Sequence, residues 1–238
     1  MSNANYSLQY GATRIEYSLL YAKRKTLAIH VKPDRTVQVK APMGTALTDI
    51  EAVVRKRANW ILRHQRQFAS YPSPTPPRQY VSGETHRYLG RQYRLKVIEA
   101  EKEWVKLSRG YLHVWTANKD DTARVKQLLD DWYQRQAVRV FQERLDACYP
   151  RVKRLGIPYP PLTIRTLKSR WGSCSPVGKI TLNLKLIQTP KECIDYVVFH
   201  ELCHLQEHNH GRGYYQLLGQ VCPDWKERKA QLNGCEVV

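Results

Sequence analysis

The feature that most restricts the fold of this chain is the pentapeptide His200-Glu201-Leu202-Cys203-His204. On an α-helix, residues four apart lie one above the other on the same face, so the two imidazoles can bind a single cation. Glu201 then lies beside the cation without being required as a ligand. The pattern H-E-x-x-H therefore predicts a helix that carries a metal centre with a carboxylate next to it.

A third ligand is expected from the segment that follows. His210 lies six residues beyond His204, and the intervening Asn209 tolerates the left-handed conformation that would turn the chain back. His208 is the alternative, but on a continuing helix it would lie too far along the axis to reach the same ion. We therefore expect His200, His204 and His210 to hold one Zn²⁺ ion.

Three protein ligands leave a fourth position open to solvent, where zinc lowers the pKa of a water molecule to about 7. Glu201 is the candidate catalytic base that accepts the proton of this water. The pattern predicts a zinc-dependent metallohydrolase, with a metallopeptidase as the first choice. Two alternatives remain open: a metal-dependent nucleotide phosphoanhydride hydrolase, and a basic nucleic-acid-binding module with a structural metal.

Local signals also favour a helix at the motif. Thr189, Pro190 and Glu192 have the spacing of a capping box with proline at the first helical position. The spacings of four, four and three residues predict a buried face, made of Ile194, Val198, Leu202 and Leu205.

The charge of the chain points to an anionic partner. The 39 lysines and arginines outnumber the 21 acidic residues and give a formal net charge of +18. Such a surface attracts nucleic acid, nucleotides or acidic proteins. Charge alone does not choose among them, and a generally basic solvated surface explains it equally well.

The remaining composition is that of a globular protein without a membrane segment. No apolar run approaches the ~20 residues of a membrane span, and the first ten residues lack the pattern of an export signal. The six cysteines have neither C-x-x-C pairs nor the spacing of a disulfide framework, which is typical of a reducing compartment. We therefore expect a cytoplasmic protein.

Periodicity along the chain predicts four segments. Residues 1–69 contain a β-hairpin, with strands within 27–31 and 37–39, followed by one basic helix over 49–68 with Thr48 as its cap. A proline-rich connector follows at 70–79, then a β-rich segment at 80–118. Residues 119–238 begin with a long amphipathic helix, Asp121 to Cys148, which ends near Pro150 and packs behind the motif helix.

Several blocks of the chain resemble the YgjP-like metallopeptidase family, which is related to SprT-like proteins and belongs to the zincin class. The blocks are Ser169-Arg170-Trp171-Gly172-Ser173-Cys174-Ser175, Gly178-x-Ile180-x-Leu182-Asn183, Tyr196-Val197-Val198-x-His200-Glu201-Leu202-x-His204, Asn209-His210 and Pro223-Asp224-Trp225-Lys226. The resemblance implies an α+β fold with a zincin-like catalytic domain after a β-rich N-terminal portion. It also implies that His200, His204 and His210 bind zinc and that Glu201 is the base. Tyr214-Tyr215 stand where relatives usually show an aromatic pair containing Phe or Trp.

Hydrolysis of a peptide needs a strand edge for the extended substrate and a donor for the developing oxyanion. Residues 180–186 alternate as a strand and are the predicted edge. Arg170, Tyr214 and His208 are the candidate contacts to the substrate or the transition state. A structural ion pair for Arg170 and simple packing for Tyr214 are equally good explanations.

Overall fold

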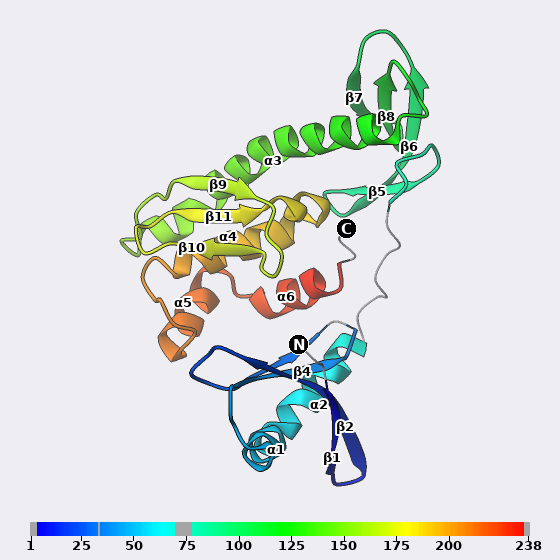
Figure 1. The fold of residues 1–238 in the computed structure, drawn as a ribbon. Coiled ribbons are helices and arrows are strands. Elements are labelled where there is room, and N and C mark those ends of the chain that lie inside the picture. Colours follow the sequence, from blue (N-terminus) through cyan, green and yellow to red (C-terminus); the bar gives the residue numbers. More distant parts are fainter. Residues whose placement is uncertain (1–3, 33, 70–77, 236–238) are drawn as a thin grey trace. The chain divides into compact units, whose positions relative to one another are not determined.

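The computed structural model describes residues 4–32, 34–69 and 78–235, and the chain divides into two compact units, Met1–Ser73 and Pro74–Val238. Figure 1 shows the elements of both units. The connector predicted at 70–79 lies outside the described residues except for Arg78 and Gln79. Within the described part of the chain, no helix combines the length and the apolar character needed to cross a membrane.

The N-terminal unit contains a four-stranded sheet. Strands β1 (Ala4–Tyr10) and β2 (Thr13–Ala22) form an antiparallel hairpin, and β3 (Ala28–Val31) and β4 (Val37–Pro42) form a second one. The second hairpin confirms the prediction from the alternating residues of this segment. Because β2 and β4 pair in parallel, the strand order is β1-β2-β4-β3.

Two helices, α1 (Leu47–Lys56) and α2 (Ala58–Ala69), pack against this sheet where the sequence predicted one. The helix breaks at Arg57, whose backbone N–H is shared between the carbonyls of Val53 and Val54. The single-helix prediction was wrong because the apolar spacing from Ile50 to Ile61 continues unchanged across the break. The predicted cap also differs: Thr48 lies inside α1, which begins after Ala46.

The larger unit begins with a second four-stranded sheet, of order β5-β6-β8-β7. Its strands are β5 (Thr85–Tyr88), β6 (Arg91–Glu99), β7 (Trp104–Ser108) and β8 (Tyr111–Thr116). Buried residues of this sheet, such as Leu95 and Val114, share one hydrophobic core with residues of the following helix and of the motif helix. The segments 80–118 and 119–238 therefore belong to one unit.

Helix α3 (Thr122–Lys153) follows, and the carboxylate of Asp121 caps it by accepting a hydrogen bond from the backbone N–H of Arg124. It extends beyond the end predicted at Pro150. Proline removes one backbone donor from the helix. Val152, however, is fully buried on the next turn, and its burial favours continuation of the helix.

Between α3 and the motif helix, the chain forms a three-stranded sheet. Its strands are β9 (Leu162–Arg165), β10 (Gly172–Cys174) and β11 (Ile180–Asn183). The strand predicted over 180–186 is shorter, because the 3₁₀ helix η1 (Leu184–Gln188) replaces its end. The order is β10-β11-β9. The prediction that residues 180–186 form the edge was wrong, since β10 folds back onto β11 and itself occupies the edge.

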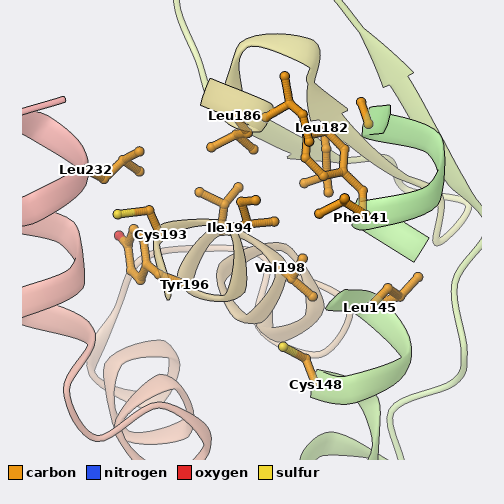
Figure 2. Packing of buried hydrophobic residues seen from close by; sticks show 14 of the residues in the cluster. Phe141, Leu145, Cys148, Leu182, Leu186, Cys193, Ile194, Tyr196, Val198 and Leu232 are labelled. Atoms are coloured by element: carbon orange, nitrogen blue, oxygen red, sulfur yellow. The ribbon is translucent and has the colours of Figure 1, made fainter. Parts of the chain in front are cut away.

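The motif helix α4 (Lys191–Cys203) is buried on nearly every side. Figure 2 shows Ile194 and Val198 packed between Phe141 and Cys148 of α3 and the residues of η1 and α6. The predicted capping box does not form, because the hydroxyl of Thr189 donates to the Leu186 carbonyl instead. Two helices complete the unit, α5 (Arg212–Val221) and α6 (Trp225–Asn233).

Candidate metal centre

The three predicted histidines come from the end of α4 and the loop that follows it. His200 lies in the last turn of the helix, and His204 is its C-cap. The helix therefore ends earlier than expected, and the chain turns at once, with the N–H of Glu207 bonded to the carbonyl of Cys203. His210 follows in the loop and precedes Gly211, the N-cap of α5 (Arg212–Val221).

The predicted left-handed turn at Asn209 was wrong. Asn209 is not one of the described non-glycine residues that have a positive φ angle. The early end of α4 makes such a turn unnecessary, because the loop from His204 to His210 already leaves the helix axis. His208 lies in the same loop and not on a continuing helix.

The imidazoles converge on one point. The Nε2 atom of His210 lies 3.1 Å from Nε2 of His204 and 3.2 Å from Nε2 of His200, and one ligand atom from each of the three lies within 4.8 Å of the others. Tetrahedral zinc with Zn–N bonds of about 2.0–2.1 Å separates its ligand nitrogens by roughly 3.3 Å. The donor set and its spacing therefore fit a Zn²⁺ ion.

The second nitrogen of two imidazoles is engaged elsewhere. Nδ1 of His204 lies 3.0 Å from the Glu207 carbonyl, which can only accept, so this nitrogen carries the proton and Nε2 keeps its lone pair. Nδ1 of His200 lies 2.6 Å from the hydroxyl of Tyr214. Partners of this kind fix the ring orientation of metal ligands.

The protonation of the histidines also suits a metal. Burial, aided by the neighbouring His204 and His210, lowers the pKa of His200 to about 3. Burial and His204 likewise lower the pKa of His210. Since only a neutral imidazole can donate a lone pair, these rings are ready to bind a cation at neutral pH.

Glu201 is buried, with 3% of its surface exposed. Burial raises the pKa of its carboxyl to about 8, and the positive charge of Arg170 acts in the opposite direction. A divalent ion beside the carboxyl would lower this pKa again. The site therefore combines three imidazole nitrogen donors with one buried acid whose pKa depends on burial and on the charges around it.

A cavity of about 550 Å³ opens in front of these groups. Arg170 and His208, two of the predicted contacts, line it, but the third, Tyr214, is fully buried behind the histidines and does not. The other lining residues are Gly172, Ser173, Cys174, Ser175, Pro176, His200, Glu201, His204 and His210. A larger cavity of about 1340 Å³ lies in the N-terminal unit and contains none of the predicted site residues.

Sequence reasoning missed two residues that shape this cavity. A Cβ atom on Gly172 would lie 2.6 Å from Oε1 of Glu201, so any larger residue there would displace the Glu201 side chain. The buried amide of Asn183 donates to the carbonyls of Leu167 and Arg170 and holds the loop that enters β10. Both residues stand in the blocks that carry the family resemblance, but neither has a side chain that suggests a role in catalysis.

A convergent histidine triad beside the glutamate of an H-E-x-x-H helix is the arrangement that metal-dependent hydrolases use. A comparison with protein families agrees, because the family model of the YgjP-like metallopeptidase domain matches residues 25–234. The chain belongs to the YgjP-like family and is a metallopeptidase by that membership. The predicted resemblance and the α+β fold class are thereby confirmed.

Two solved structures are similar to part of the chain. The metallopeptidase zymogen abylysin of Pyrococcus abyssi is 26% identical, with a TM-score of 0.33, over 37% of this chain and 87% of that one. The metallopeptidase zymogen jannalysin of Methanocaldococcus jannaschii is 21% identical, with a TM-score of 0.31, over 38% of this chain and 94% of that one. None of the curated proteins compared with the chain matches it.

Proposed function

We propose that this metallopeptidase is zinc-dependent, with His200, His204 and His210 as ligands and Glu201 as the general base. The observation that supports this most directly is the meeting of three Nε2 atoms on the wall of the cavity that the Glu201 carboxyl also lines. Imidazole suits zinc among the divalent metals of proteins. The three-ligand set leaves room for the substrate, as catalytic zinc sites require.

When bound, zinc polarises the scissile carbonyl and makes the attacking water more acidic. Glu201 receives the proton of that water and returns it to the leaving amine, as a general base and then a general acid. Its carboxyl is suited to both roles because burial raises its pKa towards neutrality while Arg170 and a cation oppose that shift.

The walls of the cavity suit an extended peptide. β10 is an edge strand with one side paired to β11, and residues 172–174 line the cavity. A substrate strand can add to such an edge through backbone hydrogen bonds. The exposed Arg170 and His208 line the same cavity and are our candidates for stabilising the oxyanion.

The two alternative functions have less support. Family membership implies a peptide or protein substrate, and nothing in the comparisons points to nucleotides or nucleic acid. The high positive charge remains compatible with an acidic protein substrate.

The experiment is an activity screen with matched metal loading. The purified chain and the Glu201→Gln variant are stripped of metal, reloaded with zinc, and assayed against casein and a library of quenched fluorescent peptides. We expect wild-type cleavage that a chelator abolishes, and a variant that holds zinc with activity reduced by about 10²–10⁴-fold. Chelator-sensitive phosphate release from nucleoside triphosphates without any proteolysis would refute the proposal.

A further inference from the structure

Tyr214 occupies a central place behind the metal centre. It lies on the first turn of α5, no part of it is exposed, and its ring contacts each of the three imidazoles. The centroid distances are 5.4 Å to His200, 4.6 Å to His204 and 4.7 Å to His210. No other aromatic ring among the described residues touches all three.

The hydroxyl of Tyr214 has two partners on the same residue. It lies 2.6 Å from Nδ1 and 3.3 Å from the carbonyl oxygen of His200. The carbonyl can only accept, so the hydroxyl donates its hydrogen there and accepts one from the Nδ1–H group. This assignment pairs all three polar atoms and leaves the lone pair of His200 on Nε2, which faces the other histidines.

We infer that Tyr214 is the positioning residue of the metal centre: its ring supports the three imidazoles, and its hydroxyl holds His200 in the tautomer that can bind the ion. The inference rests on the proposed zinc site, and it replaces the sequence-based prediction that Tyr214 contacts the substrate. A residue buried behind the ligands acts through them and not on the peptide.

The geometry explains why the hydroxyl matters in addition to the ring. A neutral imidazole with its proton on Nε2 cannot bind a cation through that atom. His204 is held in the correct tautomer by a backbone carbonyl, which no substitution removes. The tautomer of His200 depends instead on the side chain of Tyr214, 14 residues away.

Tyr214→Phe tests this directly, because it keeps the ring and removes only the hydroxyl. Tyr215→Phe is the matched control, since Tyr215 is 40% exposed and its ring stacks on Trp225. Both metal-free proteins are checked for folding by circular dichroism. Their zinc affinity is then measured by competition with a chromophoric chelator.

We expect Tyr214→Phe to bind zinc about 10–100-fold more weakly than the wild type, as for other residues that orient metal ligands, and Tyr215→Phe to match the wild type. A substrate-contacting role would instead lower activity with zinc affinity unchanged. If the zinc affinity of Tyr214→Phe were within about twofold of the wild-type value, the inference about Tyr214 would be wrong and the proposed function would stand. If the wild type bound no zinc, both the inference and the proposed function would be wrong.

A second measurement needs neither metal nor a substituted tyrosine. Long-range ¹H–¹⁵N spectra of the metal-free wild type report the tautomer of each histidine, and His200→Asn identifies the signals of His200. We expect the proton of His200 on Nδ1. A proton on Nε2 would refute the inference, even if Tyr214→Phe proves unable to fold.

Discussion

The side chain of Glu201 lies against the backbone of Gly172. A Cβ atom built on Gly172 would lie 2.6 Å from Oε1, 2.9 Å from Cγ and 3.0 Å from Cδ of Glu201. These distances are shorter than contacts between non-bonded heavy atoms allow. The Glu201 side chain therefore keeps its present position only because residue 172 has no side chain.

Gly172→Ala should displace the Glu201 carboxyl and reduce catalysis. A displacement of about 1 Å can cost about 10²-fold in rate, and overpacking costs about 1–3 kcal/mol of stability. We expect kcat/KM to fall by roughly that factor while zinc affinity stays near the wild-type value. Steady-state kinetics on a peptide substrate, with zinc titration, measure both.

Gly219→Ala is the control for this substitution. Gly219 lies in α5, and a Cβ atom added to it would have no neighbour within 4 Å, so alanine should leave activity unchanged. A helical alanine should stabilise the chain by about 0.5–1 kcal/mol relative to glycine. Equal activity of the two alanine variants would show that Gly172 does not set the position of Glu201.

His210→Ala should remove the third ligand and with it the stabilisation that zinc provides. A ligand that binds only the folded state raises stability by about 2.7 kcal/mol at 100 times its Kd. We expect zinc to raise the Tm of the wild type and of His208→Ala, but to have little effect on that of His210→Ala. Thermal melts with and without zinc measure this, and the opposite ranking would make His208 the ligand.

Asn183→Ala should loosen the loop that enters β10. The substitution removes the hydrogen bonds that the amide donates to the carbonyls of Leu167 and Arg170, and a hydrogen bond contributes about 0.5–1.5 kcal/mol to stability. We expect the free energy of unfolding to fall by about 2 kcal/mol and trypsin to cleave faster at Lys168 and Arg170. Urea denaturation and timed digests followed by mass spectrometry measure the two effects.

Asn118→Ala is the matched control, because among the described residues the side chain of the exposed Asn118 bonds only the nearby Asp120 N–H. It should change stability by less than about 0.5 kcal/mol. If both variants unfold alike, Asn183 does not hold the loop.

His86 should make the larger unit less stable in mild acid. Its Nδ1 accepts from Arg78, and its Nε2 donates to Glu84 over 3.2 Å. Burial, with the charge of Arg78, lowers the pKa of His86 to about 4, whereas the unfolded chain has a histidine pKa of about 6.5. The unfolded state therefore binds more protons between these values.

The stability that His86 provides is thus fully present above about pH 6.5 and is lost as the pH falls towards about 4, by roughly 3 kcal/mol in total. We expect His86→Gln to flatten this part of the curve of stability against pH, and the partly buried His113→Gln to leave it unchanged. Urea denaturation at closely spaced pH values measures the slopes. An unchanged slope in His86→Gln would contradict the assignment.

The sequence by itself determined the features that depend on interactions between residues close together in the chain. The i, i+4 spacing of His200 and His204 predicts their shared face on any helix, because helical geometry is local. Alternation and 3.6-residue periodicity predicted the second hairpin of the N-terminal unit and the long helix α3 for the same reason. The ordered blocks around the motif were sufficient to identify the family.

Only the tertiary structure decided how distant segments meet. The pairing of β10 with β11 placed Gly172 against Glu201 and moved the edge away from residues 180–186, and the packing of α5 on α4 turned Tyr214 from a candidate substrate contact into a partner of His200. The break at Arg57 and the early end of α4 were not predicted, because the apolar spacing continues past both of them. The approach of Gly172 to Glu201 and of Tyr214 to His200 depends on contacts between residues far apart in the chain, which spacing along the sequence does not encode.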